Sequence, residues 1–170
     1  GATPQCRNVD LAVVGGGDSA CEEAVYLTKY GSRVHLVVRS GQLRASKAMA
    51  DRVLANPSIT VHWNRRIRDC SGSDWLEAIE LEDAHGNLTE RVAVRGLFYA
   101  IGHTPNTSFL KGQIELDDHG FIKTKNGPET NIPGVFACGD VQDSYYRQAI
   151  TAAGSGCQAA IKVERFLEGH

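Results

Sequence analysis

The sequence has 170 residues, of which 42% are hydrophobic, and its 18 Lys and Arg residues against 20 Asp and Glu residues leave a formal net charge of −2. This balance provides no positive field for nucleic acid or an acidic membrane surface, and no apolar run approaches the roughly 18 residues needed to cross a bilayer, so we expect neither partner. Glycine stands out, with 18 residues or about 11% of the chain against about 7% in ordinary proteins, and the glycines are clustered.

A βαβ unit is predicted near the N-terminus. Val9–Val14 form a short apolar run that stops at three glycines, which is typical of a strand buried on both faces. A helical pattern follows over Ser19–Lys29, and Gly31 is placed to end that helix. A second apolar run at Val34–Val38 completes the unit.

The middle of the chain is predicted to add a helix, a hairpin and two strands. Arg44–Leu54 has the pattern of a helix, and Ile59–Trp63 that of a strand. Ile67–Val94 alternates apolar and polar side chains around His85-Gly86-Asn87, which indicates an antiparallel hairpin. Leu97–Ile101 is expected to be another buried strand.

Three further elements are predicted in the C-terminal part. A hairpin is expected around Asp118-His119-Gly120, a short strand at Val135–Ala137, and a final helix over Arg147–Leu167. The order of elements along the whole chain predicts an α/β fold with a central parallel sheet and a small antiparallel β layer.

The cysteines are odd in number, widely spaced and contain no C-x-x-C pair. This pattern argues against a structural zinc site and against a disulfide framework, so we expect no metal site. We interpret the cysteines instead as small buried side chains of a protein in a reducing compartment. The five residues are Cys6, Cys21, Cys70, Cys138 and Cys157.

The first glycine cluster has the spacing G-x-G-x-x-A between a predicted strand and a predicted helix. In a dinucleotide-binding turn, one glycine permits the tight turn, the next lets a pyrophosphate approach the backbone, and the small third residue lets the helix pack on the strand. The N–H groups and positive dipole end of the helix then face the phosphates. A tight strand–helix turn without a ligand is the alternative. The predicted cofactor-binding residues here are Gly15, Gly17, Asp18, Ser19 and Ala20.

The end of the second predicted strand distinguishes NAD from NADP. An NAD site has Asp or Glu there, about 20 residues past the glycines, bonded to the ribose 2′-hydroxyl. This strand instead ends in Arg39 and Ser40, with Arg44 shortly after. Two guanidinium groups suit a 2′-phosphate by charge and by bidentate geometry. The sequence therefore favours NADPH over NADH, with arginines on a solvated loop as the alternative.

Four stretches occur in the order GGGDSACEEA, LRASK, GLFYAIGHTPN and GVFACGDVQDSYYRQAITAAGSGC. Together they resemble the low-molecular-weight NADPH-dependent thioredoxin reductases, over nearly the whole chain. The resemblance implies a Rossmann-like FAD/NAD(P)-binding fold. It also implies that hydride passes from NADPH to FAD, and that electrons then pass to a dithiol and to thioredoxin.

The resemblance implies that the second glycine cluster serves the flavin. Gly139 and Asp140 match residues that contact the ribityl–pyrophosphate portion of FAD. Arg147, Gln148 and Ala149 match residues that lie along the isoalloxazine ring, with the N-terminus of their helix aimed at it.

Further residues match the family between these clusters. Ile101, Gly102 and His103 correspond to the turn that joins the nicotinamide and flavin domains. Glu23 matches a helix glutamate near the nicotinamide, with a solvated helix face as the alternative. Many relatives carry a second basic residue where this chain has Ser40, which leaves Arg39 and Arg44 for the 2′-phosphate.

By this resemblance, residues 1–105 would be the NADPH-binding domain and residues 106–170 an incomplete C-terminal segment of the FAD-binding domain. The redox-active C-x-x-C of the family would lie upstream of Gly1, so we expect no catalytic residue in this chain and no thioredoxin reduction by it alone. The complete protein is expected to be a homodimer that reduces thioredoxin or a fused thioredoxin domain. We expect it in a reducing intracellular compartment, the cytoplasm or an organelle such as a plastid.

Two other functions fit the same motifs. A flavoenzyme of this architecture without the dithiol, such as a ferredoxin–NADP reductase, would share the glycine turns. A non-catalytic NADPH-binding module would bind the nucleotide without any flavin partner.

Overall fold

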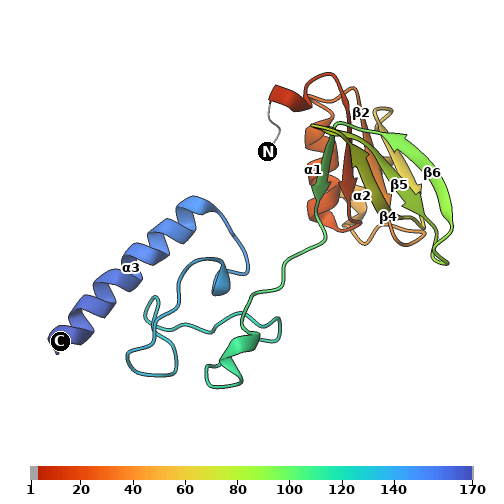
Figure 1. Cartoon of the computed structure of the whole chain (residues 1–170). Coiled ribbons are helices and arrows are strands. Elements are labelled where there is room, and N and C mark those ends of the chain that lie inside the picture. The colour runs from red at the N-terminus through yellow and green to blue at the C-terminus, as the bar shows by residue number, and fades with distance from the viewer. Residues whose placement is uncertain (1–3, 170) are drawn as a thin grey trace. The chain divides into compact units, whose positions relative to one another are not determined.

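The computed structural model describes residues 4–169, apart from the side chain of Thr89. The first three residues of the predicted NADPH-binding domain and the last residue of the predicted flavin segment lie outside this range. The chain divides into two compact units, one that ends at Gly102 and one that begins at His103 (Figure 1).

The first unit is built on a parallel sheet of four strands in the order β3-β2-β1-β7. Ala12 in the central strand lies opposite His35 on one side and Leu97 on the other, and all three pairings are parallel. The predicted parallel sheet is thus confirmed. Its strands are β1 (Asp10–Val14), β2 (Arg33–Val38), β3 (Ile59–Trp63) and β7 (Gly96–Tyr99).

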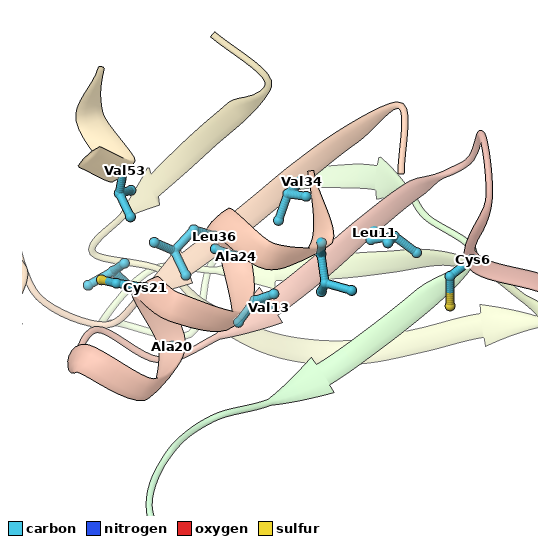
Figure 2. Packing of buried hydrophobic residues seen from close by; sticks show 11 residues of the cluster. Cys6, Leu11, Val13, Ala20, Cys21, Ala24, Val34, Leu36 and Val53 are labelled. Carbon is cyan, nitrogen blue, oxygen red and sulfur yellow. The ribbon is translucent and has the colours of Figure 1, made fainter. Parts of the chain in front are cut away.

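Two helices cover one face of this sheet, and the side chains between them form the larger hydrophobic core. Alternate residues of β1 and β2 point toward the helices, and Leu11, Val13 and Leu36 are completely buried there (Figure 2). Small side chains on the first helix, such as Ala20 and Ala24, let it lie close to the strands. The helices are α1 (Asp18–Leu27) and α2 (Lys47–Leu54).

A three-stranded antiparallel layer, in the order β4-β5-β6, covers the opposite face (Figure 1). Ala12 and Val37, which alternate with the helix-facing residues, pack against Ile79 and Leu81 of this layer. Successive side chains of a strand point to opposite faces, so β1 and β2 are apolar at most positions because both faces are buried. The predicted fold class and hairpin are confirmed, with one extra strand. The strands are β4 (Arg66–Gly72), β5 (Leu76–Glu82) and β6 (Leu88–Ala93).

Two histidines form a polar contact inside this layered core. Nδ1 of His35 lies 2.9 Å from Nε2 of His62, and Nδ1 of His62 lies 2.6 Å from a carboxylate oxygen of Glu90. Nε2 of His35 is 3.5 Å from Oδ2 of Asp10 and has no hydrogen-bond partner among the described residues. Burial lowers the pKa of both imidazoles, which outweighs the opposing effect of the two carboxylates. Both rings are therefore neutral at pH 7.

Helix α2 and strand β7 differ from their predicted bounds. Helix α2 begins at Lys47 rather than Arg44, because the backbone before it is extended at Ser46 and belongs to the preceding loop. Strand β7 ends at Tyr99 and is only half-buried, and Ile101 is 69% exposed. The prediction of a fully buried strand was wrong because β7 lies at the edge of the sheet.

The role of Gly31 also differs from the prediction. Helix α1 ends at Leu27 rather than Lys29, and Gly31 is not in the left-handed conformation of a helix-ending glycine. A Cβ at Gly31 would lie 3.0 Å from Cδ1 of Leu11 and 3.0 Å from the carbonyl oxygen of Val9. Close packing therefore explains this glycine.

The second unit contains one long helix, α3 (Ala149–Glu168), and two short 3-10 helices at Ser108–Leu110 and Gly139–Val141. Ala159 is the only buried residue of α3. A small apolar cluster formed by Ile114, Ile122 and Ala137 lies elsewhere in the unit.

Three predictions in this unit need correction. Val135–Ala137 does not form a strand, since only an isolated bridge joins Phe136 to Glu129. The predicted hairpin around Asp118-His119-Gly120 is a turn closed by a single bridge rather than by paired strands. Helix α3 begins two residues after Arg147, which has a left-handed backbone with φ +48°.

Candidate functional site

A cavity of about 680 Å³ lies where β1, β2 and β7 end. Ligands of α/β proteins bind in this position, outside the carboxyl ends of parallel strands. The glycine turn after β1, the arginine-bearing end of β2 and the segment after β7 all contribute to its wall. The predicted residues that line it are Gly15, Gly17, Asp18, Ser19, Arg39, Arg44, Ile101 and Gly102.

The two predicted glycines of the turn, Gly15 and Gly17, are needed for different reasons. Gly15 has φ +145°, and a Cβ there would clash with the carbonyl oxygen of Ala100 and lie 2.7 Å from Cβ of Ala20. A Cβ on Gly17 would meet no atom within 4 Å. Gly15 is thus required by the fold, whereas Gly17 keeps an open approach to the backbone. Ala20 is completely buried behind the turn and does not line the cavity, so it acts through packing.

Helix α1 begins at the cavity wall. Gly17 occupies the N-cap position without a side-chain cap, and the amide of Cys21 is bonded to the carbonyl of Gly17. The amides of Asp18, Ser19 and Ala20 precede this first helical bond and have no acceptor within the helix. They provide the donors and the positive dipole end that an anion needs.

Four arginines line the cavity, and two of them were not predicted from the sequence. Arg39 and Arg44 follow β2, as expected, and neither has a carboxylate partner within 4 Å among the described residues. Arg65 lies in the turn between β3 and β4, and Arg66 is the first residue of β4. The available signal was the pair of consecutive arginines that follows the predicted strand Ile59–Trp63 after Asn64. Placing them beside Arg39 requires the pairing of β3 with β2.

The two unpredicted arginines are bonded differently. Arg66 lies 3.9 Å from a carboxylate oxygen of Glu82 and donates to the carbonyl of Ala84 at 3.2 Å. The guanidinium of Arg65 donates only to the adjacent carbonyl of Asn64, at 3.1 Å, and has no carboxylate partner among the described residues. Arg65 therefore remains available for an anionic ligand.

The loop between β2 and α2 is bonded to the glycine turn. The amide of Arg44 donates to the carbonyl of Gly16 at 2.6 Å. The amide and the hydroxyl of Ser46 both donate to Oδ1 of Asp18, each at 2.9 Å. Both bonds lower the pKa of the Asp18 carboxyl, and the bond from the backbone amide has the larger effect.

The remaining predicted residues occupy other places. Arg147 and Asp140 line a cavity of about 370 Å³ in the second unit, where the Arg147 guanidinium lies 2.9 Å from Nδ1 of His103. Gly139 and Gln148, like Ala149, do not line this cavity. The amide of Gly139 donates to the hydroxyl of Ser155 at 2.9 Å.

Four further observations concern predicted residues and site types. Gln148 caps helix α3 through reciprocal bonds with Thr151, and Ala149 is the first helical residue. Glu23 is half-buried on α1 and does not line the nucleotide-side cavity. No group of His, Cys, Asp and Glu side chains in residues 4–169 has the arrangement of a metal site. No helix in this part of the chain has the length and apolar character to cross a membrane.

Comparison with known proteins gives consistent matches. A family described as pyridine nucleotide-disulphide oxidoreductase matches residues 3–156. A thioredoxin reductase of Schizosaccharomyces pombe is 55% identical over 170 residues, which cover 99% of this chain and 53% of that protein. A thioredoxin reductase of Chlamydia trachomatis is 53% identical over 169 residues, covering 99% of this chain and 54% of that protein.

Solved structures agree with these matches. A thioredoxin reductase from Streptococcus pyogenes has a TM-score of 0.83 and 39% identity, over 96% of this chain and 54% of that one. The chain spans about half the length of the curated relatives it matches. Since the family match extends over most of the sequence, the chain belongs to the pyridine nucleotide-disulphide oxidoreductase family.

Proposed function

We propose that this chain is the NADPH-binding portion of a thioredoxin reductase. Residues 1–105 would be the NADPH-binding domain, and residues 106–170 a segment of the FAD-binding domain. The relatives named thioredoxin reductase support this proposal, with more than half of the aligned residues identical. The single observation that carries it is the cavity that combines a glycine turn, a helix N-terminus and four arginines.

The cavity fits a dinucleotide that carries an extra phosphate. Gly17 leaves the backbone open, and the first amides of α1 offer donors to a pyrophosphate. Arg39 stands where an NAD site has a carboxylate, and Arg44 and Arg65 add positive charge beside it. Asp18 is the only acidic side chain among the described residues of the lining, and Ser46 already occupies its Oδ1. The charge pattern therefore favours NADPH over NADH.

This chain would bind and orient its cofactors rather than perform the thiol chemistry. When bound, NADPH supplies the hydride and FAD the two-electron carrier between nucleotide and disulfide. The left-handed Gly139 and the N-terminus of α3 suit the phosphate and ring portions of a flavin. Cys138 and Cys157 are free thiols outside any C-x-x-C pair, so the chain offers no dithiol of that type.

The complete protein would pass electrons to thioredoxin or to a fused thioredoxin domain, and we propose that it does so as a homodimer. The free thiols of Cys21, Cys70, Cys138 and Cys157 suit a reducing compartment within the cell, such as the cytoplasm or an organelle.

The test of nucleotide choice is a titration of the 170-residue chain with NADPH and with NADH. We expect tighter binding of NADPH. Arg39→Ala should weaken NADPH binding by about tenfold or more, since a hydrogen bond to a charged group contributes about 1.5–3 kcal/mol, and it should leave NADH binding unchanged. Arg52→Ala is the matched control, because this exposed residue on α2 carries the same charge but does not line the cavity. Equal binding of both nucleotides by the unmodified chain would contradict the proposal.

The reductase activity needs a separate experiment on the full-length protein that contains this sequence. NADPH-dependent reduction of thioredoxin is expected from that protein and not from the 170-residue chain. A yellow preparation of the chain alone that reduces a disulfide with NADPH would contradict this division of roles. Nucleotide binding without thioredoxin reduction by the full-length protein would instead indicate a dithiol-less flavoenzyme or a binding module.

A further inference from the structure

Asp18 places a negative charge in the wall of the proposed phosphate site. Its carboxylate is ionised at neutral pH, and it lies on the first turn of α1, where a bound pyrophosphate would approach. Like charges at such a position repel one another, which would weaken nucleotide binding. A carboxylate in this position therefore calls for a function other than direct contact with phosphate.

The structure shows what this carboxylate binds. Oδ1 of Asp18 accepts two hydrogen bonds of 2.9 Å from Ser46, one from its amide and one from its hydroxyl. Ser46 is 28 residues away in the sequence and occupies the N-cap position of α2. It closes the loop that follows β2 and carries Arg39 and Arg44. Asp18 thus joins the glycine turn to the end of the arginine loop.

The arginine loop has few other hydrogen bonds to the rest of the unit. Between β2 and α2 it has no helix or strand, and most of its residues are exposed or half-buried. Apart from the Asp18 bonds, it is hydrogen-bonded by the amide of Arg44 on Gly16 and, at its start, by the amide of Asn64 on the carbonyl of Ser40 at 3.3 Å. Leu43 and Ala45, both half-buried, also pack against the core, whereas Arg39, Arg44 and Ser46 are exposed. The long side chain of Arg44 gains phosphate affinity only if its backbone is already ordered, because ordering on binding costs free energy.

We propose that Asp18 is a positioning residue for 2′-phosphate recognition: it holds Ser46, and through Ser46 the Arg39–Arg44 loop, against the glycine turn. Asp18 itself need not contact the nucleotide. This inference rests on the proposed NADPH site and assigns to Asp18 a role different from that of the glycines beside it. Its effect should appear only with ligands that carry the 2′-phosphate.

Three substitutions separate this role from direct binding. Asp18→Asn keeps a carbonyl oxygen for both Ser46 donors while it removes the charge, so the preference for NADPH should be retained. Asp18→Ala removes the acceptor and should reduce the ratio of NADPH to NADH affinity by about tenfold, the change expected when about 1.4 kcal/mol of interaction is lost. Ser46→Ala removes one of the two bonds and should give an intermediate ratio. Glu22→Ala, an exposed carboxylate on the same helix, is the matched control.

The experiment measures dissociation constants of the 170-residue chain for NADPH, NADH, 2′,5′-ADP and 5′-AMP, with thermal unfolding of each variant as a check of folding. The two ligands with a 2′-phosphate should lose affinity in Asp18→Ala, and the other two should not. In the background of Arg44→Ala, adding Asp18→Ala should change the preference much less, because the loop then has less to position.

The outcomes distinguish this inference from the proposed function. If the unmodified chain shows no preference for NADPH, the NADPH site itself is wrong. If that preference exists and Asp18→Ala retains it, or weakens all four ligands equally, the positioning role is wrong. Should Asp18→Ala fail to fold, Ser46→Ala alone and Ser46→Ala in the Arg44→Ala background decide the question by the same ratios.

Discussion

Gly15 and Gly17 lie two residues apart in one turn. From the structure we expect that a side chain at Gly15 lowers stability, whereas a side chain at Gly17 weakens nucleotide binding. At Gly15, an alanine Cβ would clash with the carbonyl oxygen of Ala100 and lie 2.7 Å from Cβ of Ala20, at a backbone φ of +145°. Backbone strain of this kind costs about 1–3 kcal/mol, and overpacking costs about another 1–3 kcal/mol. Gly15→Ala should therefore lower the free energy of unfolding by about 2–6 kcal/mol, a large part of the roughly 5–15 kcal/mol of a whole domain.

Gly17→Ala provides the internal control. Its Cβ would have no neighbour within 4 Å and its φ is −92°, so the free energy of unfolding should change by less than about 1 kcal/mol, the scale of an N-cap effect. The added methyl group would instead occupy the surface that a pyrophosphate approaches. Gly17→Ala should thus weaken NADPH and NADH binding alike, without loss of stability.

Urea unfolding followed by tryptophan fluorescence tests both statements. The two tryptophans, Trp63 and Trp75, both belong to the first unit, so the signal reports on the part of the chain that contains the turn. With a slope of about 2 kcal/mol/M, a loss of 4 kcal/mol would lower the midpoint by about 2 M for Gly15→Ala. Equal midpoints for the two variants, or a larger loss for Gly17→Ala, would refute the reasoning.

Three further predictions concern the core and the arginines. Burial keeps His35 and His62 neutral in the folded chain, so the unfolded chain binds more protons below about pH 6.5, and stability should fall as the pH decreases from 7.5 to 5.5. Urea midpoints at the two pH values measure this, and a pH-independent midpoint would contradict it. Arg65→Ala should weaken NADPH binding more than Arg66→Ala does, because only Arg66 is held by Glu82, and isothermal titration compares the two. Leu11→Ala should cost about 2–5 kcal/mol in the free energy of unfolding, because its side chain is completely buried between sheet and helices.

Much of the first unit was predictable because its signals are local. The apolar runs at β1 and β2 indicate strands buried on both faces, and both faces are indeed covered. The spacing from Gly15 to Ala20 indicates a tight strand–helix turn, and the backbone at Gly15 shows the conformation that requires glycine there. Arg39 and Arg44 could be placed at the cavity because they directly follow a recognisable strand.

Predictions failed where an element depends on a neighbour that is distant in the sequence. Val135–Ala137 has the composition of a strand, but a strand also needs a partner along its length, and Phe136 finds only a single bridge. Gly31 appeared to end a helix, whereas the side chain of Leu11 on a separate strand explains it. Burial of β7 was overestimated because its place at the sheet edge is a property of strand order.

The sequence by itself determined the strand–turn–helix pattern, the glycines and the two arginines after β2, because each depends on residues adjacent in the chain. Only the tertiary structure decided that Arg65 shares their cavity and that the carboxylate of Asp18 binds Ser46. Both results depend on the parallel pairing of β3 with β2 and on the path of the loop into α2. Asp18 and Ser46 are 28 positions apart in the sequence, and no local pattern specifies which of the possible partners will meet.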